Sequence, residues 1–522
     1  MPAPRTGPHR TGPHRTAPRT GPRTGPALIP RPTQLTVTSG KFVLDGRTGI
    51  RATGGAEPAA ALLRTHLAPA TGLPLPLASD GRVVLALDPH LTGLGAEGYG
   101  LTVGTDAVLL RAARPAGLLH GIQTLRQLLP PAALSGTPAP DAHWSLPCVQ
   151  ITDVPRFPWR GAMLDVARHF QPVGFLRRFV DLMALHKLNV LHLHLTDDQG
   201  WRMPVAAYPR LTEVGGMPHG GAYSRAELTA LVAHAADRGV TVVPEIEMPG
   251  HVRAALAAYP HLGNRPGRRL DVWRQWGVCG TVLGVHDEVL DFCRTVLDEV
   301  IDVFPSRHVH IGGEECPTTE WHASPAARRR AEQEGIGGPE ALHGWFMGRI
   351  GAHLHERGRQ PLGWTETGLD LPSSFTAMMW RDEAHALAAA RRGQQVIMAP
   401  YRSTYLDYPQ SADAGEPPGQ PGAVVDLRTV YATEPAPAHW EAEAADRVLG
   451  TQAQLWTEYV TTAEHAEYLA FPRLCALADT AWSGGGDWTG FTARLHHHRA
   501  RLGALGVPSR PPTTTPSERK TR

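Results

Sequence analysis

The chain has 522 residues, 42% of them hydrophobic, which is enough to bury more than one core. Its formal net charge of +2 gives no global field that would attract nucleic acid. No apolar run approaches the ~18 residues of a membrane span, and the five cysteines form no C-x-x-C pair. We therefore expect no nucleic-acid or membrane partner, no disulfide framework and no cysteine-based zinc site.

Both ends of the chain are predicted to lack structure. Residues 1–29 are mostly a degenerate repeat of Arg, Thr, Gly, Pro and His, and residues 509–522 are similarly polar. The N-terminal repeat contains no hydrophobic segment of the kind that a secretory signal needs. The location is therefore open: the chain as written predicts the cytoplasm, and a mis-assigned start would allow export.

Residues 30–152 are expected to form a small α+β domain. The stretches QLTVTSGKFVL (34–44) and YGLTVGTDAVLLRA (99–112) alternate apolar and polar residues, and the second contains the Gly-Thr-Asp turn of a hairpin. Leucines and an isoleucine recur at helical spacing in AGLLHGIQTLRQLLP (116–130), where proline ends the helix. This domain shows no cluster of side chains suited to catalysis.

Residues 153–508 alternate short apolar runs with amphipathic helical stretches, the pattern of β/α units around a parallel sheet. Eight such units predict a (β/α)8 barrel, also called a TIM barrel. The candidate strands are GAMLDVAR (161–168), NVLHLHLTDD (189–198), TVVPEIEMPGH (241–251), HVHIGGEE (308–315), PLGWTE (361–366), TAMMW (376–380), QVIMAP (395–400) and TQAQLWTE (451–458).

The carboxyl ends of these strands carry the informative residues, because that end of a barrel forms the active face. Carboxylates and aromatic rings gathered at one rim indicate a sugar pocket, in which rings stack on sugar faces and charged groups bind hydroxyls. The residues are Arg168, Asp197, Asp198, His251, Glu314, Glu315, Trp364, Glu366, Trp380, Tyr405, Asp407, Trp456 and Glu458.

A metal site is an alternative interpretation of the same end of the barrel. The pairs HLH (192–194) and HVH (308–310) place imidazoles on one side of a strand, and Asp197 and His251 could add ligands. Such a set is typical of metal-dependent barrel hydrolases. However, the second pair leads into Gly-Gly and the eighth strand offers no clear ligand, which favours core histidines hydrogen-bonded between strands.

The adjacent acids Glu314 and Glu315 favour acid chemistry. The preceding Gly312 and Gly313 can bend the chain so that both carboxyls address one pocket. Two neighbouring carboxylates resist ionising together, so the pKa of one is expected to rise and that group can act as a general acid. A glycosidase needs such an acid to protonate the leaving oxygen.

An ordered set of motifs across about residues 155–485 closely resembles family 20 glycoside hydrolases, the β-N-acetylhexosaminidases. The motifs are PRFPWRGAMLDVARHF, KLNVLHLHLTDDQGWR, PEIEMPGH, HIGGEE, YLD, LWTE and FPRLCALADTAWS. The upstream EGYGLTV and AGLLHGIQTLRQLL resemble the small N-terminal domain of that family.

The resemblance implies an exo-acting enzyme that needs no metal or other cofactor. It would release terminal β-linked GlcNAc or GalNAc from the non-reducing end of an oligosaccharide, such as a chitooligosaccharide, or of a glycoconjugate. Catalysis would be retaining and substrate-assisted: the 2-acetamido oxygen of the substrate attacks the anomeric carbon and forms an oxazolinium intermediate, so the enzyme supplies no nucleophile. No oligomeric state is implied.

Carried over by motif, the resemblance implies that Glu315 is the general acid and base and that Glu314 orients the acetamide N–H. The other implied contacts are Arg168 and Glu458 to ring hydroxyls, Asp407 to the hydroxymethyl group, Tyr405 to the acetamide carbonyl, Trp364, Trp380 and Trp456 as pocket walls, and Asp197 with His251 as support for the acid.

Two positions depart from the family pattern, because Glu314 and Glu247 stand where the family usually has Asp. The added methylene moves a carboxylate by roughly 1.5 Å, the length of one C–C bond. The alternatives are therefore a compensated pocket, a weakly active sugar-binding relative, or a related glycosidase that releases a different unit.

Overall fold

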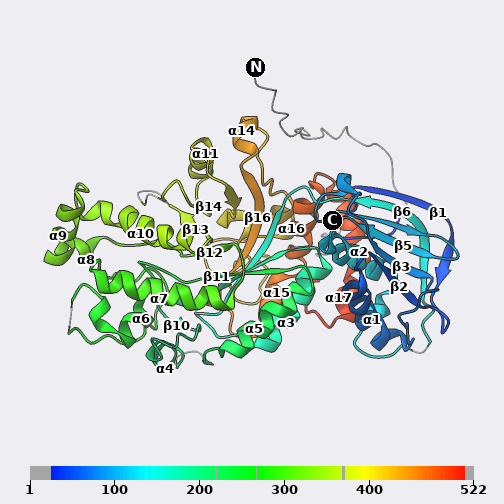
Figure 1. Ribbon diagram of the computed structural model, residues 1–522, viewed down its shortest axis with the longest axis horizontal. Helices are drawn as coiled ribbons and strands as arrows, with labels where there is room; N and C mark the ends of the chain where they lie inside the picture. Colours follow the sequence, from blue (N-terminus) through cyan, green and yellow to red (C-terminus); the bar gives the residue numbers. More distant parts are fainter. Residues whose placement is uncertain are drawn as a thin grey trace, which may run out of the picture.

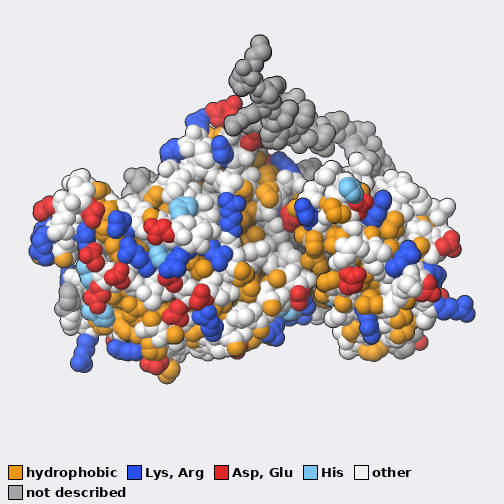
Figure 2. Space-filling view, in the orientation of Figure 1, with side chains coloured by type: hydrophobic (Ala, Val, Ile, Leu, Met, Phe, Trp, Pro, Cys, Tyr) orange, Lys and Arg blue, Asp and Glu red, His pale blue; other side chains and the backbone are white. Residues whose placement is uncertain are grey.

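The computed structural model describes residues 25–139, 141–217, 220–265, 267–366, 369 and 371–511. These residues form a smaller sheet domain that packs beside a larger closed barrel (Figure 1). Acidic and basic side chains are interspersed over the face drawn in Figure 2. None of the described helices is long and apolar enough to cross a membrane.

The N-terminal domain is a six-stranded mixed sheet with two helices on one face, as its alternating patterns predict. Leu101 and Leu110 of the sheet share a core with Leu118 and Ile122 of α2. The predicted hairpin is present, since β4 and β5 pair antiparallel. The elements are β1 (Gln34–Val43), β2 (Ile50–Thr53), α1 (Glu57–Thr71), β3 (Val83–Leu87), η1 (Thr92–Leu94), β4 (Tyr99–Val103), β5 (Val108–Ala112), α2 (Pro115–Leu128), η2 (Pro131–Leu134) and β6 (Ser145–Asp153), in the sheet order β1-β6-β4-β5-β3-β2.

The larger, C-terminal domain is a closed barrel of eight parallel strands, which confirms the predicted fold class. All eight candidate stretches contribute a strand, and Arg168, Asp197, Glu314, Glu366 and Glu458 each lie beyond the last residue of their strand or, for Asp197, in the short ribbon after it. Around the barrel the strands are β7 (Trp159–Asp165), β8 (Val190–His194), β11 (Thr241–Glu245), β12 (His308–His310), β13 (Gln360–Thr365), β14 (Thr376–Met379), β15 (Val396–Met398) and β16 (Val448–Leu455).

Helices cover the outside of the barrel (Figure 1). In α7, Val289, Cys293, Val296 and Val300 recur every three or four residues and are buried, while the opposite side of the helix is charged. The longer helices are α3 (Val173–Leu185), α5 (Arg225–Ala236), α7 (Asp287–Val303), α9 (Pro325–Glu334), α10 (Leu342–Glu356), α11 (Glu383–Arg391), α15 (Ala463–Ala470), α16 (Arg473–Ser483) and α17 (Trp488–Ala504).

Short elements decorate the loops at the rim and between the helices. They are β9 (Thr196–Asp197), β10 (Gly200–Trp201), α4 (Arg210–Gly215), α6 (Arg253–Ala258), η4 (Pro260–Leu262), α8 (Thr319–Ala323), η5 (Pro339–Ala341), α12 (Tyr401–Thr404), α13 (Leu427–Tyr431) and α14 (Ala442–Ala445). The β9–β10 ribbon, which the sequence patterns do not predict, turns Asp197 and Asp198 back over the end of β8.

A buried polar cluster joins the two domains. The Lys187 ammonium, 1% exposed, lies 2.8 Å from Asp153 and 2.9 Å from the hydroxyl of Tyr99. Asp153 also accepts a hydrogen bond from the indole N–H of Trp482 at 2.8 Å. Because both charges are paired and hydrogen-bonded, their burial between the domains is tolerated.

The predicted tails extend too far into the folded chain. Residues 1–24 and 512–522 lie outside the described residues, but Leu28 and Ile29 are buried, and the Ile29 amide donates to Gln127 at 3.0 Å. At the other end, Arg510 lies 3.0 Å from Glu416. These apolar and paired residues adjoin strongly polar segments, and the composition of those segments placed the predicted tail boundaries too far into the folded part of the chain.

Candidate active site

Four aromatic side chains form a continuous wall at the carboxyl end of the barrel strands. The rings of Trp364 and Trp456 are 6.1 Å apart, as are those of Tyr405 and Trp456. Trp380 stacks on Tyr405 with centroids 6.3 Å apart and planes 11° from parallel. The structure thus brings together the four predicted ring residues from strands distant in sequence, and such a surface suits the apolar faces of a sugar.

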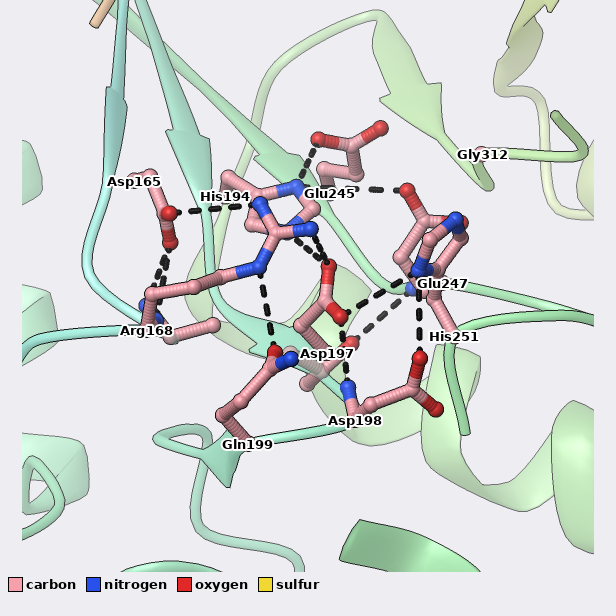
Figure 3. A network of polar contacts seen from close by, with 12 residues as sticks. Asp165, Arg168, His194, Asp197, Asp198, Gln199, Glu245, Glu247, His251 and Gly312 are labelled. Atoms are coloured by element: carbon pink, nitrogen blue, oxygen red, sulfur yellow. Dashed lines mark hydrogen bonds and ion pairs between the residues drawn. The ribbon is translucent and has the colours of Figure 1, made fainter. Parts of the chain in front are cut away.

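A chain of charged contacts runs beside this wall (Figure 3). The Arg168 guanidinium lies 5.0 Å from the ring of Trp456 and 2.8 Å from a carboxylate oxygen of Asp197. The other Asp197 oxygen is 3.2 Å from His251 Nδ1, and His251 Nε2 is 3.6 Å from Glu315 Oε2. The predicted Asp197–His251 pair therefore connects the hydroxyl-binding arginine to the predicted general acid.

Backbone strain accompanies this chain. His251 and Glu315 have φ values of 51° and 47°, a left-handed conformation that is costly for residues with a Cβ. Glu366 stabilises the second of them, because its carboxylate accepts the Glu315 amide N–H at 2.6 Å. Sequence reasoning placed Glu366 at a strand end without assigning it a role.

Glu314 lies deeper, against a second carboxyl group. It is 8% exposed, and its side chain interacts with that of Glu247. The chain bends at Gly312 and Gly313, with φ values of 63° and 101°. A Cβ on Gly312 would lie 1.6 Å from a Glu247 oxygen, so only glycine fits beside this carboxyl. The two glutamates that depart from the family pattern are therefore neighbours in space.

The pKa order of the two acids is opposite to the one expected from the sequence. Burial, together with the negative charge of Glu245, raises the pKa of Glu314 to about 7. Burial also acts to raise the pKa of Glu315, but the hydrogen bond and charge of His251 and the charge of Arg381 outweigh it and hold that pKa below its ordinary value. The elevated pKa thus belongs to the deeper glutamate and not to the predicted general acid.

The two carboxyls predicted to bind sugar hydroxyls, Asp407 and Glu458, lie near each other, and Glu458 also lies near Arg168. Burial raises the pKa of Asp407, and the charge of Glu458 raises it further. Burial likewise raises the pKa of Glu458, against the opposing charge of Arg168. One carboxylate oxygen of Asp407 is buried and has no hydrogen-bond partner among the described residues, so it can accept a bond from a substrate hydroxyl.

Three histidines gather around one buried glutamate under the site. Glu245 lies 2.7 Å from His310 and 3.1 Å from His192, and it is also bonded to His194. The Trp364 indole donates to the same carboxyl at 2.8 Å. These contacts confirm the expectation of hydrogen-bonded core histidines for His192, His194 and His310, whereas the half-buried His308 packs against Trp159 and its Nε2 has no hydrogen-bond partner among the described residues.

The geometry of this cluster also bears on the metal alternative. Ligand atoms of His192, Glu245 and His310 lie within 4.8 Å of one another, as do those of Asp197, Asp198 and His251, so either set could hold a cation. In the first set, however, both oxygens of Glu245 are already bonded to protein groups, one to His194 and the other to the Trp364 indole.

The substitution Glu245→Gln is expected to lower the free energy of unfolding by about 3–5 kcal/mol, the usual loss when one partner of a buried ion pair is removed. The Glu245 charge, working against burial, raises the pKa of His194 to about 10, so the variant would bury an imidazolium with less compensation. Urea unfolding monitored by tryptophan fluorescence measures the loss. The exposed Glu332→Gln is the matched control, and a loss for Glu245→Gln no larger than that of the control would contradict the prediction.

Comparison with known proteins decides the family. Residues 157–485 match the model of the glycosyl hydrolase family 20 catalytic domain, and residues 25–154 match that of glycosyl hydrolase family 20, domain 2. The chain belongs to glycosyl hydrolase family 20. The resemblance predicted from its motifs is confirmed, and the protein is a glycoside hydrolase of the β-hexosaminidase family.

Relatives of this family 20 enzyme cover most of its length. A β-hexosaminidase of Porphyromonas gingivalis is 37% identical over 92% of the chain, which spans 64% of that relative. One of Akkermansia muciniphila is 37% identical over 84% of the chain and 88% of the relative. The solved family 20 β-N-acetylhexosaminidase of Streptomyces coelicolor superposes with a TM-score of 0.84 at 33% identity, covering 94% of this chain and 98% of that one.

Proposed function

We propose that this family 20 enzyme is an exo-acting β-N-acetylhexosaminidase that removes terminal β-linked GlcNAc or GalNAc from oligosaccharides or glycoconjugates. The observation that carries the proposal is the adjacent pair Glu314 and Glu315, one buried and one facing the rim, beside an aromatic wall. The named relatives, all β-hexosaminidases, support the same activity.

The proposed reaction uses the acetamido group of the substrate as the nucleophile. Its carbonyl oxygen attacks the anomeric carbon while the Glu314 carboxylate accepts a hydrogen bond from the acetamide N–H and balances the developing positive charge. Glu315 gives its proton to the leaving oxygen as the glycosidic bond breaks. In the second half, the Glu315 carboxylate takes a proton from water, which opens the oxazolinium ring with net retention.

Substrate positioning is assigned to the surrounding side chains. Arg168 and Glu458 would bind ring hydroxyls, and the free oxygen of Asp407 would accept a bond from the hydroxymethyl group. Tyr405 would donate to the acetamide carbonyl oxygen. The tryptophan wall would press the acetamido group against the anomeric carbon, and such close approach is a main source of intramolecular rate advantage.

The direct test of the proposed reaction is the configuration of the first product. Proton NMR during hydrolysis of 4-nitrophenyl β-GlcNAc, which releases a single sugar, should show the β anomer of GlcNAc before mutarotation. An α anomer appearing first would indicate inversion and would rule out the oxazolinium route.

The pH dependence of kcat/KM follows from the pKa order of the two glutamates. The reaction needs Glu315 protonated and Glu314 ionised, whereas the free protein favours the opposite arrangement. The reactive fraction is therefore constant between the two pKa values. It falls above pH about 7, because Glu315 keeps losing its proton while Glu314 is already ionised. It falls in acid below the pKa of Glu315. Initial rates on chitobiose across pH test this profile, and full activity retained at pH 9 would contradict it.

Chelation is expected to leave the activity unchanged. The histidines of both H-x-H pairs lie in the barrel core or against Trp159, and no step assigned above uses a cation. Dialysis against EDTA followed by assay on 4-nitrophenyl β-GlcNAc measures the effect. If the activity is lost on dialysis and is restored by adding zinc or magnesium, the metal-dependent hydrolase is favoured instead.

A further inference from the structure

Two charged residues at the rim have no part in the reaction as assigned above. Arg381 follows β14 and its side chain is 50% exposed, while Glu366 follows β13 and its side chain is 12% exposed. Both contact the predicted general acid.

Arg381 is shared between two carboxylates. Its Nη2 lies 3.0 Å from Glu315 Oε1, and its Nη1 lies 3.3 Å from Glu366 Oε1. Its guanidinium also packs on Trp380, 4.1 Å from the ring centroid. The other Glu366 oxygen accepts the amide N–H of Glu315. Glu366 is therefore held in place by the backbone of the acid, and Arg381 can move between two acceptors that are both fixed.

The two oxygens of Glu315 consequently have different partners. Oε2 faces His251 in the interior, and Oε1 faces Arg381 at the exposed rim. A proton destined for a leaving oxygen on that side would sit on Oε1. An arginine N–H points at the same oxygen, so the proton and the arginine contact exclude each other.

Resting on the proposed function, we propose that Arg381 is a positioning residue that switches between Glu315 and Glu366 according to whether a leaving sugar occupies the rim. A sugar entering over Trp380 displaces the guanidinium onto Glu366, which frees Oε1 to carry the proton. When that sugar has left with the proton, Arg381 returns and stabilises the Glu315 carboxylate that activates water. The switch thus allows Glu315 to carry a proton in the first half of the reaction and stabilises its carboxylate in the second half.

The charges around Glu315 agree with this assignment. His251 and Arg168 favour its ionised form from the interior, and Arg381 favours that form from the rim. The neighbouring Glu366 carboxylate opposes it, because like charges disfavour ionisation. Of the three positive groups only Arg381 is largely exposed, so it is the one that a substrate can displace without unfolding the site.

The test compares pH profiles of chitobiose hydrolysis by the full-length wild type, Arg381→Met and Glu366→Gln. The Met side chain keeps the packing on Trp380, and the Gln side chain still accepts the Glu315 amide. Since Glu315 has the lower pKa of the two catalytic acids, its titration sets the acidic limb of kcat/KM. That limb should move up by about one pH unit in Arg381→Met, because an adjacent positive charge is lost. It should move down in Glu366→Gln, where Arg381 no longer has a competing anion.

Two further measurements separate a switch from a structural role. Arg381→Lys, which keeps the charge, should stay close to the wild type, and Arg392→Met, at an exposed residue at the C-terminal end of α11, should have no effect. The acidic limb of kcat, which reports the complex with chitobiose, should lie above that of kcat/KM in the wild type, and the two should converge in Arg381→Met.

If the wild type is active and Arg381→Met leaves the acidic limb of kcat/KM unchanged, the inference is overturned while the proposed function stands. Movement of the limb in the same direction in Arg381→Met and Glu366→Gln would also overturn it, since that result indicates a general disturbance of the site. A wild type inactive on both chitobiose and 4-nitrophenyl β-GlcNAc would refute the proposed function, and the inference would fall with it.

Discussion

Glu315→Gln is expected to lower kcat/KM for chitobiose by about 10²–10⁴-fold, the usual contribution of general acid catalysis. The amide cannot give a proton to the departing sugar oxygen, although its carbonyl oxygen can still accept a hydrogen bond from Arg381. The loss of kcat/KM should be smaller for 4-nitrophenyl β-GlcNAc, because nitrophenolate leaves without a proton. Initial rates on the two substrates measure the difference.

The control for this substitution is Glu332→Gln, which makes the same chemical change on the exposed side of α9. It should retain wild-type rates on both substrates. If Glu315→Gln hydrolysed chitobiose normally, Glu315 would not be the acid, and the assignment by motif would be wrong at its main residue.

The second large effect is expected from Glu314. Glu314→Ala should remove the preference for substrates that carry a 2-acetamido group, because nothing would then orient the acetamide or balance the positive charge of the oxazolinium. Glu314→Asp should retain the charge but withdraw it by about 1.5 Å, and a displacement of that order can lower the rate about a hundredfold. Rates on 4-nitrophenyl β-GlcNAc and 4-nitrophenyl β-glucoside give the preference.

The contact between Glu314 and Glu247 makes this prediction more specific. Both side chains are one methylene longer than is usual in the family, and they meet beside Gly312. If they form a matched pair, Glu314→Asp combined with Glu247→Asp should be more active than Glu314→Asp alone. Equal activities would show that the two positions act independently, and a Glu314→Asp variant faster than the wild type would show that glutamate impairs the pocket.

Much of the architecture could be predicted from the sequence because it depends on local pattern. The run VLHLH is a fully buried strand, TVVPE is buried after its first residue, and the amphipathic spacing of α7 fixes which side packs inward. The site residues could also be proposed, since the carboxyl ends of parallel strands converge on one rim. The aromatic wall and the contacts that lead from Arg168 through Asp197 and His251 to Glu315 lie at this rim.

The charge state of the site could not be predicted in the same way. The pKa order of Glu314 and Glu315 depends on Glu245, His251 and Arg381, which come from three other parts of the chain. Adjacency in sequence suggested that the two acids act on each other. In space, however, one is buried beside further acids and the other lies between two positive groups, and these surroundings decide the order.

Glu366 illustrates the same limit. Its position at the end of a strand marked it as part of the rim, but its role became visible only through the Glu315 amide that it accepts and the arginine that it shares. The first contact joins residues 51 positions apart, and the arginine that Glu366 shares with Glu315 lies 66 positions from Glu315. No periodicity or motif encodes contacts of that kind.

The central claim is that the acetamido group of the substrate is the nucleophile. The most direct test is the ratio of kcat/KM for 4-nitrophenyl β-GlcNAc to that for 4-nitrophenyl β-glucoside, measured on the wild type with EDTA present. The substrate-assisted mechanism predicts clear turnover of the GlcNAc substrate. It predicts almost no turnover of the glucoside, which has a hydroxyl in place of the acetamido group. Comparable turnover of both would contradict substrate assistance and would require a nucleophile from the protein.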